Sequence, residues 1–325
     1  MKEIKKDHPI IATEKIPEDI NDIKKYFSSY KIIVLIPAYN EERFIGSVVL
    51  KIREFPVRVL LIDDGSTDCT AAVARAAGAR VHSLCLNQGK GAALNFGFNK
   101  ASKLKPDAIV VIDGDGQHLP EELPRIVCPI LEGKADITIG SRYLGITTET
   151  PLHRKIGHKL INLATSISSG VVVSDSQSGY RAFSRKAYEA IQFSSSGFSV
   201  ESEMQFLAKE NDLKVLDIPI TITYLDKEKR SAFQQGILVL NGILRLIGQY
   251  RPLLFFGVTG SILLIAGIVW GIFVVERFIK TGQLAAGYAM ICVLLSVVGM
   301  VLFSTGITLH SIRALLLEYL SRKHN

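Results

Sequence analysis

A short apolar run that ends in two acidic residues decides the fold of this chain: Ile109-Val110-Val111-Ile112-Asp113-Gly114-Asp115-Gly116-Gln117-His118. The four apolar residues have the composition of a buried strand, and the acids follow at its carboxyl end. Open α/β sheets bind their ligands at that edge. Carboxylates are hard ligands that accept but do not donate, which suits Mg²⁺ or Mn²⁺. The stretch predicts a divalent metal site, with an acidic turn as the plainer alternative.

Strand-like and helix-like segments alternate around this stretch, which predicts parallel βαβ units and an α/β fold. Three strands end at Pro37, Asp63 and Asp113, so we expect these residues to line one edge of the sheet. The expected strands are residues 31–37, 57–64, 79–84, 108–113 and 136–140. The expected helices are residues 41–55, 69–77, 91–103 and one that begins at Pro120.

The following part of the chain has a mainly helical pattern over residues 152–207, interrupted at 174–181 and 194–199. Residues 213–224 predict a pair of strands bent at Pro219. Apolar residues recur at helical spacing over 233–247, which predicts an amphipathic helix in the membrane interface, or else an ordinary domain helix.

Two long apolar segments lie near the C-terminal end. Residues 253–275 and 284–309 contain no charged residue, and each exceeds the ~20 apolar residues that cross a bilayer as a helix. Two buried core helices are the alternative. Gly267 and Gly271 form a Gly-x-x-x-Gly step that permits close helix packing and is compatible with a homo-oligomer.

Basic residues are more numerous on the two outer flanks of this pair of segments than in the short segment that connects them. The connection holds Glu276, Arg277 and Lys280. The positive-inside rule therefore predicts a transmembrane hairpin with both flanks in the cytoplasm, together with the preceding domain. The flanking basic residues are Lys227, Lys229, Arg230, Arg245, Arg251, Arg313, Arg322 and Lys323.

The overall composition excludes several other classes of protein. The net charge is +7, yet no segment has the pattern of a DNA- or RNA-binding module, so no nucleic acid partner is expected. The four cysteines, Cys69, Cys85, Cys128 and Cys292, have no paired spacing and fit reduced thiols better than disulfides or a zinc site. Residues 1–30 alternate lysine with acids and predict a solvated arm with a short amphipathic part, not a targeting signal.

Several short patterns occur along the chain: Pro37-Ala38-Tyr39-Asn40-Glu41, Asp63-Asp64-Gly65-Ser66-Thr67-Asp68, Asn87-x-Gly89-Lys90-Gly91, Asp113-x-Asp115-x-Gln117-His118, Gly140-Ser141-Arg142-Tyr143, Gln177-Ser178-Gly179-Tyr180-Arg181 and Glu201-x-Glu203. Their order and spacing closely resemble the family 2 glycosyltransferases. Together with the predicted membrane hairpin, they resemble the polyprenyl-phosphate (dolichyl-phosphate) hexose synthases within that family.

The resemblance implies a GT-A (Rossmann-like) nucleotide-sugar-binding domain at residues 31–231. An interfacial helix at 232–252 and a hairpin at 253–312 would follow, with spans at about 253–275 and 287–309 and a cytoplasmic tail at 313–325. The implied reaction transfers one hexose from a UDP- or GDP-linked donor to polyprenyl or dolichyl phosphate. Single displacement at the anomeric carbon would invert its configuration.

Donor binding is assigned by this resemblance to the first four patterns. Tyr39 is expected to pack against the base or ribose, Glu41 to accept a hydrogen bond from them, and Asp63 to contact the base. A helix cap is the alternative for Tyr39 and Glu41, and a solvated helix start is the alternative to phosphate binding by Lys90. The nucleotide-sugar set is Pro37, Ala38, Tyr39, Glu41, Asp63, Lys90, Asp113, Gly114 and Asp115; the metal set for Mg²⁺ or Mn²⁺ is Asp113, Asp115 and Gln117.

The acceptor is assigned to arginines, because a lipid phosphate is already anionic and can attack without a base removing a proton. Guanidinium groups pair bidentately with phosphate. Arg142 and Arg181 match family arginines, and with Asp113 and Asp115 they form the predicted catalytic set. Arg230 and Ser231 complete the acceptor set, although residues 227–231 match the glycine-rich segment of mannose synthases only loosely.

Three acids near the end of this domain have open roles. Asp175, Glu201 and Glu203 are candidates to orient sugar hydroxyls or Arg181. Support of the fold is the alternative, which for Glu203 would be a helix cap or an arginine pair.

Other activities remain open from the sequence. A processive polysaccharide synthase typically carries Gln-x-x-Arg-Trp, but the only tryptophan, Trp270, lies in a predicted span. A transferase to hydroxyl acceptors would need a clear base. A non-catalytic membrane scaffold would have lost donor-site acids that are present here.

Overall fold

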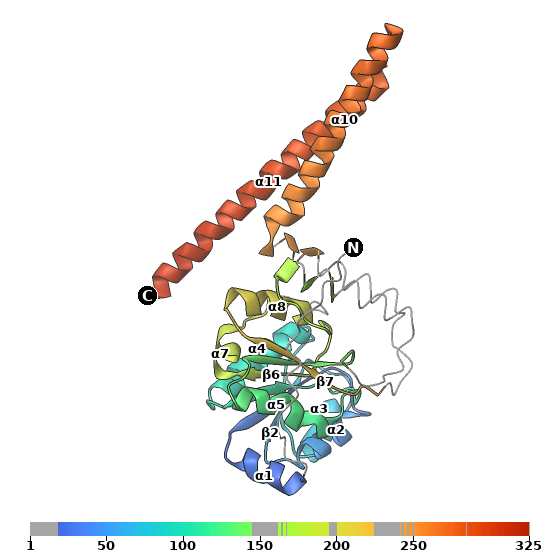
Figure 1. The fold of residues 1–325 in the computed structure, drawn as a ribbon. Coiled ribbons are helices and arrows are strands. Elements are labelled where there is room, and N and C mark those ends of the chain that lie inside the picture. The colour runs from blue at the N-terminus through green and yellow to red at the C-terminus, as the bar shows by residue number, and fades with distance from the viewer. Residues whose placement is uncertain are drawn as a thin grey trace. The chain divides into compact units, whose positions relative to one another are not determined.

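In a computed structural model, the chain forms two compact units, Met1–Ile243 and Leu244–Asn325 (Figure 1). The structure describes residues 19–144, 162–163, 165–166, 168–194, 200–223, 241, 244–245, 247–248, 250–283 and 285–324, with side chains as far as residue 316. Arg230, Ser231 and most of the predicted interfacial helix at 232–252 lie outside the described residues.

The first unit contains a sheet of seven strands in the order β3-β2-β1-β4-β6-β5-β7. Strands β1 to β4 pair in parallel, and β5 pairs in parallel with β7. Only β6 is antiparallel to its neighbours β4 and β5 among the described strands. The strands are β1 (Ile32–Ala38), β2 (Arg58–Asp63), β3 (Arg80–Ser83), β4 (Ala108–Val111), β5 (Ile137–Ser141), β6 (Arg181–Ser184) and β7 (Val215–Pro219).

Helices pack on both faces of this sheet, so its central strands are apolar throughout. Val34 and Ile36 of β1 belong to the core that includes residues of α1, α2, α3 and α5. On the other face, Gly97 of α4 packs so closely on Leu35 that a Cβ atom would lie 2.4 Å from its Cδ1. The helices are α1 (Ile20–Ser28), α2 (Ile45–Ile52), α3 (Thr70–Ala76), α4 (Lys90–Ser102), the 3₁₀ turn η1 (Pro120–Glu122), α5 (Leu123–Leu131), α7 (Arg185–Ala190) and α8 (Val200–Glu210).

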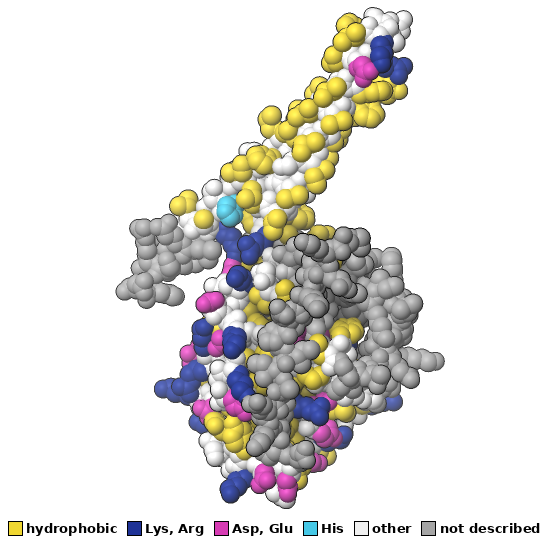
Figure 2. Space-filling view, in the orientation of Figure 1, with side chains coloured by type: hydrophobic (Ala, Val, Ile, Leu, Met, Phe, Trp, Pro, Cys, Tyr) yellow, Lys and Arg dark blue, Asp and Glu magenta, His cyan; other side chains and the backbone are white. Residues whose placement is uncertain are grey.

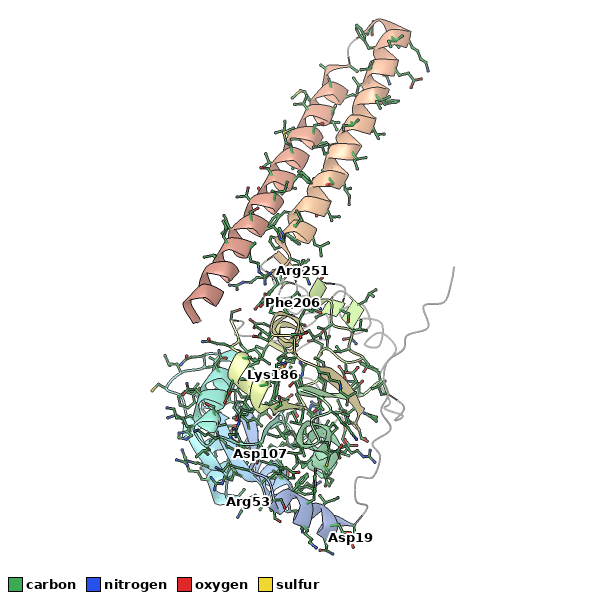
Figure 3. The ribbon with its side chains drawn as sticks, turned by 60° about the vertical axis from the view of Figure 1, so that its left-hand side comes forward. Asp19, Arg53, Asp107, Lys186, Phe206 and Arg251 are labelled. Carbon is green, nitrogen blue, oxygen red and sulfur yellow. The ribbon has the colours of Figure 1, made fainter. Side chains whose placement is uncertain are left out.

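The two edges of the sheet have different roles. Strands β2 and β4 flank β1 on opposite sides, so the direction of chain progression reverses between β1 and β4. Ligands bind outside the carboxyl ends of strands at such a switch point. At the amino-terminal edge, the carboxylate of Asp107 (Figure 3) accepts a hydrogen bond from the backbone N–H of Lys31 at 2.8 Å. This bond joins the start of β4 to the start of β1.

Two predictions about the elements are corrected by the structure. Residues 182–184, which the sequence pattern predicts as helical, belong instead to β6, which completes the sheet between β4 and β5. Instead of a strand pair, residues 213–223 form β7 and one isolated bridge between Ile222 and His118. The short amphipathic part that the sequence predicts within residues 1–30 corresponds to α1, which buries Phe27 against Phe55 with ring centroids 5.9 Å apart.

The second unit is a pair of long helices. A π-helical turn, η2 (Leu253–Gly257), leads into α10 (Val258–Thr281), and α11 (Ala286–His324) follows. Gly282 ends α10 in the left-handed region, with φ 66°, and its N–H donates to the Phe278 carbonyl at 2.8 Å. A guanidinium N–H of Arg313 in α11 donates to the carbonyl of Tyr250, which lies just before η2. The start of the first helix and the C-terminal part of the second, which we call the outer ends of the pair, therefore lie side by side.

Small residues bring the two helices together. Buried Gly260, Gly267 and Val274 recur every seven residues along α10. A Cβ atom on Gly267 would lie 2.5 Å from Ser296 Oγ, and one on Gly271 would lie 2.9 Å from Cys292 Sγ. The predicted Gly-x-x-x-Gly step is therefore used within one chain, against α11, and gives no support to self-association.

The outer surface of this pair is apolar along most of its length (Figure 2). Leu253–Thr281 and Ala286–Leu316 are long and apolar enough to cross a membrane, and only 17% and 11% of their most apolar windows are buried. A core helix of a soluble protein would be mostly buried, so this exposure fits a lipid environment better than the core alternative.

Candidate active site

The loop after β2 is fixed by its own carboxylates. Asp63 Oδ1 accepts a hydrogen bond from the Ser66 N–H at 2.9 Å. Asp64 accepts from Gln88 N–H at 2.9 Å and from Gly89 N–H at 2.8 Å, one on each carboxylate oxygen. Because Gly89 immediately precedes α4, Asp64 joins the carboxyl end of β2 to the start of that helix.

The turn after β1 is fixed to the same loop. Asn40 has a φ of 56°, a left-handed conformation that asparagine tolerates well. Its N–H donates to Ser66 Oγ at 3.0 Å, and its side-chain oxygen accepts from Thr67 N–H at 2.9 Å. Tyr39 is 43% exposed beside this turn, and Glu41 N–H donates to Thr70 Oγ1 at 2.8 Å. The turn thus presents an aromatic ring and an acid at the edge of the sheet.

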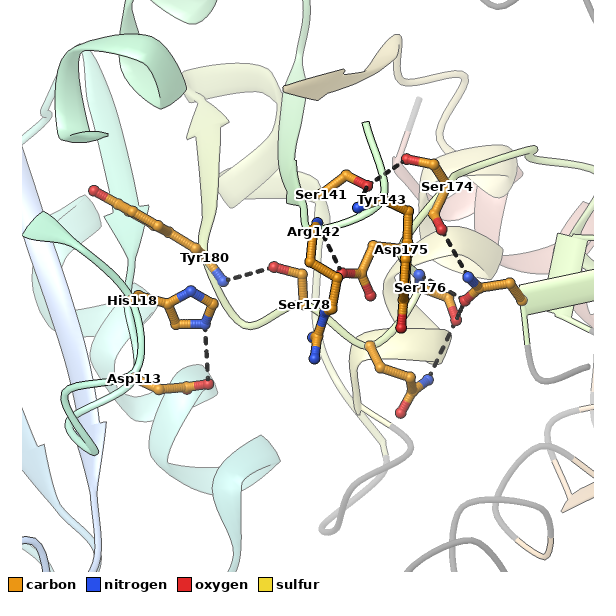
Figure 4. Close-up of polar contacts among 12 residues, drawn as sticks. Asp113, His118, Ser141, Arg142, Tyr143, Ser174, Asp175, Ser176, Ser178 and Tyr180 are labelled. Carbon is orange, nitrogen blue, oxygen red and sulfur yellow. Dashed lines mark hydrogen bonds and ion pairs between the residues drawn. The ribbon is translucent and has the colours of Figure 1, made fainter. Parts of the chain in front are cut away.

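Asp113, two residues beyond the end of β4, lies against three different segments. Its Oδ1 is 2.6 Å from Lys90 Nζ at the start of α4. Its Oδ2 is 3.9 Å from His118 Nε2 (Figure 4). A Cβ atom on Gly179 would lie 2.1 Å from Oδ2, so the backbone preceding β6 forms the third wall. Only glycine at position 179 leaves room for this carboxylate.

Lys90 joins Asp113 to helix α8. Its Nζ is also 2.6 Å from Glu201 Oε1, and the lysine side chain is 24% exposed. Burial acts to lower the pKa of Lys90, but the carboxylates of Asp113 and Glu201 outweigh it and hold this pKa above its usual range. Lys90 is therefore a charged ammonium shared by two carboxylates.

Asp115 lies in a more negative environment than Asp113. Burial, followed by the charge of Asp113, raises the pKa of Asp115 to about 6, and Glu41 acts in the same direction. Its Oδ1 accepts from the Gln117 N–H at 3.0 Å. A carboxylate crowded by other carboxylates favours the approach of a cation.

The residues present fit a divalent metal that is shared with a substrate. Among the residues described, no group of three or more His, Cys, Asp or Glu side chains is arranged to hold an ion. Mg²⁺ is, however, usually bound through one or two carboxylates together with substrate phosphates and water. Asp115, with Asp113 beside it, supplies such an incomplete set.

His118 is a neutral imidazole in this arrangement. Burial lowers its pKa to about 4, although the charge of Asp113 acts in the opposite direction. Its ring packs against Tyr180 with centroids 5.4 Å apart. This packing and the bridge to Ile222 favour a structural role for His118.

Arg142, directly after β5, forms a buried pair with an acid. Its Nε donates to Asp175 Oδ2 at 2.6 Å, and the arginine side chain is 11% exposed (Figure 4). Asp175 is fully buried, and its other oxygen accepts no hydrogen bond from the described residues. Asp175 therefore orients Arg142.

Arg181, the first residue of β6, is fully buried. Its Nε donates to the Ser178 carbonyl and its Nη2 to the Ser176 carbonyl, both at 2.8 Å. Burial lowers the pKa of the guanidinium, while four carboxylates led by Glu201 act in the opposite direction. These contacts favour a role in holding the 176–178 loop over the predicted contact with an acceptor phosphate.

Comparison with known proteins places this arrangement in a family. A model of glycosyl transferase family 2 matches residues 33–192. A UDP-N-acetylglucosamine–dolichyl-phosphate N-acetylglucosaminyltransferase of Methanococcus voltae is 31% identical over 217 residues, 60% of this chain and 86% of that protein. The chain belongs to glycosyl transferase family 2. It is an enzyme of the glycosyltransferase class, as the sequence predicted.

Two further proteins are similar to this chain, one in sequence and one in fold. A polyprenol monophosphomannose synthase of Mycolicibacterium smegmatis is 34% identical over 206 residues, 59% of this chain and 77% of that protein. Glucosyl-3-phosphoglycerate synthase of Mycobacterium tuberculosis, solved with Mn²⁺, UDP and phosphoglyceric acid, superposes with a TM-score of 0.56 at 23% identity, covering 73% of this chain and 85% of that chain. The latter match confirms the predicted GT-A fold.

Most of the predicted donor residues of this family 2 enzyme meet at one edge of the sheet. Pro37 and Ala38 are the last residues of β1. Gly114 packs against Ile45, because a Cβ atom on Gly114 would lie 3.1 Å from Ile45 Cδ1. The sequence did not predict two contacts: the Lys90–Glu201 pair and the seat that Gly179 provides for Asp113. All four residues belong to the sequence patterns that resemble the family, but those patterns do not indicate which residues contact one another.

Proposed function

We propose that this family 2 enzyme transfers one hexose from a nucleotide diphosphate sugar to a polyprenyl or dolichyl phosphate. The observation that carries the proposal is the pair Asp113 and Asp115 at the β1–β4 switch point, in a chain that also has two outward-facing apolar helices. The names of the relatives in Methanococcus voltae and Mycolicibacterium smegmatis, which include dolichyl phosphate and polyprenol, support the same substrate class.

The donor would lie along the carboxyl edge of the sheet. Tyr39 offers an exposed ring for the base or ribose, and Asp63 is held by Ser66 in a fixed orientation for the base. Asp113, Asp115 and Gln117 would hold Mg²⁺ or Mn²⁺. When bound, the ion neutralises the charge that builds on the departing nucleoside diphosphate.

The acceptor phosphate would be held by cations rather than activated by a base. A phosphate monoester is already anionic near neutral pH. Glu201 and Asp175 are each bound to a cation, Lys90 and Arg142, so neither is arranged as a strong base. Arg142 is the proposed phosphate ligand in the described part of the chain, and Arg230 and Ser231 remain predicted ligands.

Two finer features belong to the same proposal. A single displacement would invert the anomeric configuration, because no residue is proposed to form a covalent glycosyl intermediate. The catalytic unit would lie in the cytoplasm, because Arg245, Arg251 and Arg313 are near the outer ends of the helix pair, and cytoplasmic flanks carry an excess of basic residues.

The test uses the full chain in detergent micelles with a synthetic polyprenyl phosphate, Mn²⁺ or Mg²⁺, and separate UDP- and GDP-linked sugars. We expect one donor to give a lipid carrying a single sugar, identified by mass spectrometry. Asp115→Asn should reduce the rate by about 10³-fold, because metal-assisted charge stabilisation is worth several kcal/mol.

The product distinguishes the alternatives. A polymer on the lipid would indicate a processive synthase instead. Absence of any sugar-lipid with every donor, from protein that remains folded, would contradict the proposed reaction.

A further inference from the structure

We propose that the Lys90 ammonium is the counter-ion of Asp113 when no metal is bound. When a metal binds at Asp113, Glu201 acts as a positioning residue and becomes the ion-pair partner of Lys90. This inference deepens the proposed function and rests on its assignment of Asp113 to the metal–diphosphate site. Helix α8 would then take part in donor binding through Glu201, although Glu201 does not itself contact the donor.

The geometry places one ammonium between two carboxylates. Lys90 Nζ lies 2.6 Å from Asp113 Oδ1 and 2.6 Å from Glu201 Oε1. The two acids come from different parts of the chain, one after β4 and the other in the first turn of α8. Lys90 is therefore the shared counter-ion of both acids.

A metal ion and Lys90 compete for the same carboxylate. A divalent cation bound at Asp113 and Asp115 would bring positive charge close to the Lys90 ammonium and would satisfy the Asp113 oxygen that Lys90 now occupies. Two cations at one carboxylate repel each other in a site of low effective dielectric constant. Metal binding therefore requires Lys90 to give up Asp113, at least in part.

Glu201 has the capacity to accept Lys90 fully. An ammonium has three N–H donors, and a carboxylate has two acceptor oxygens. Glu201 is 5% exposed, and its Oε2 is a buried acceptor to which no described residue donates a hydrogen bond. A small rotation of the lysine side chain would replace the bond to Asp113 with one to this second oxygen, and the ammonium would stay neutralised.

This exchange predicts opposite effects for the two partners. In Glu201→Gln, Lys90 loses its second carboxylate, stays with Asp113 and competes more strongly with the metal. In Lys90→Met, the competitor is absent and Asp113 is free to bind the ion. A residue with only a structural role would weaken metal binding, or leave it unchanged, in both variants.

The experiment measures Mn²⁺ binding to the full chain in detergent micelles by electron paramagnetic resonance, first without nucleotide and then with UDP or GDP. Without nucleotide, Glu201→Gln should bind Mn²⁺ about tenfold more weakly and Lys90→Met about tenfold more tightly than the unmodified protein, since one hydrogen bond to a charged group is worth about this factor. Thermal unfolding is recorded for each variant to establish that it is folded.

Glu203→Gln is the matched control. Glu203 lies on the same helix and is fully buried, but its Oε1 accepts from Ser194 N–H at 2.8 Å and Ser194 Oγ at 2.5 Å. We expect its Mn²⁺ affinity to stay within about twofold of the unmodified protein, because Coulomb interactions weaken with distance from the site.

The outcomes separate this inference from the proposed function. Unchanged Mn²⁺ affinity in Glu201→Gln, or weaker binding in a folded Lys90→Met, would overturn the exchange while leaving the metal site in place. No Mn²⁺ binding by the unmodified protein, even with UDP or GDP, would overturn both. If Lys90→Met does not fold, the comparison of Glu201→Gln with Glu203→Gln decides alone.

Discussion

The two sides of the candidate active site are built by different means. On the donor side, carboxylates accept hydrogen bonds from backbone N–H groups, as Asp63, Asp64 and Asp115 do. On the opposite side, around residues 174–181 and α8, buried charged side chains form the contacts, as Arg142 does with Asp175. One side is a set of turns, and the other is a buried ionic network.

This difference determines what each side can tolerate. A lost acceptor in a turn leaves a backbone N–H that solvent can reach. A lost partner in a buried network leaves an uncompensated charge, which costs several kcal/mol. We therefore expect substitutions on the network side to act mainly on folding, and equivalent substitutions on the donor side to act mainly on binding and rate.

The largest effect on stability is expected for Arg181→Met. The variant removes the donors to the Ser176 and Ser178 carbonyls, together with a buried positive charge that interacts with Glu201 and Asp175. Breaking such a buried arrangement costs about 3–5 kcal/mol, which should lower the melting temperature by roughly 10 °C. Circular dichroism on the protein in detergent measures this change.

Arg185→Met is the control for this comparison. Arg185 is the first residue of α7, four positions after Arg181; it is exposed and donates a hydrogen bond to the Lys105 carbonyl at 3.2 Å. Its substitution should change the free energy of unfolding by less than about 0.5 kcal/mol. If both arginines had the same small effect, Arg181 would not be holding the loop.

The two sides also differ in how far the sequence predicts them. Strand composition followed directly by acids identified Asp63, Asp113 and Asp115 because both signals are local. The sequence predicts Arg181 as a ligand of the acceptor phosphate but does not predict its burial, because a lone arginine in a four-residue strand carries no periodic pattern of burial. Its burial depends on the packing of α8, which no local signal reports.

The same reason explains the missed contacts. The Gly179 requirement arises only once β6 pairs antiparallel with β4 and brings position 179 against the Asp113 carboxylate. The Lys90–Glu201 pair similarly needs the start of α4 and the start of α8 to meet in space. The sequence identified each residue as a member of a pattern, but the tertiary fold determines which residues are partners.

A smaller loss is expected for Asp64→Ala on the donor side. The variant removes both acceptors for the Gln88 and Gly89 N–H groups, so the turn before α4 loses its link to β2. Hydrogen bonds to a charged group contribute about 1.5–3 kcal/mol, and partial hydration of the freed N–H groups should place the loss near about 2 kcal/mol.

Asp64→Asn sharpens this prediction, because its carboxamide keeps one of the two acceptors. We expect roughly half the loss of stability seen in Asp64→Ala, measured by thermal unfolding, together with a smaller rise in the KM for the nucleotide sugar. Equal losses in the two variants would show that the charge, and not the pair of hydrogen bonds, fixes this turn.

The smallest effect is the pH dependence that Asp115 gives to the metal-free protein. Burial and the charge of Asp113 raise the pKa of Asp115 to about 6 in the folded state, above its usual value of about 3.9 in an unfolded chain. Between these values the folded state keeps a proton that the unfolded state has lost, so stability falls as the pH rises through this window.

Asp115→Asn removes this titration and should therefore become more stable relative to the unmodified protein as the pH rises from 4 to 7. The expected gain is on the order of 1–2 kcal/mol after solvent screening, measured by thermal unfolding with a chelator present. A stability difference that does not change with pH would mean that Asp115 is not crowded by Asp113 and Glu41. If Asp115→Asn is more stable than the unmodified protein at pH 7 but has lost transfer activity, the negative charge of Asp115 serves binding and catalysis and lowers the stability of the fold.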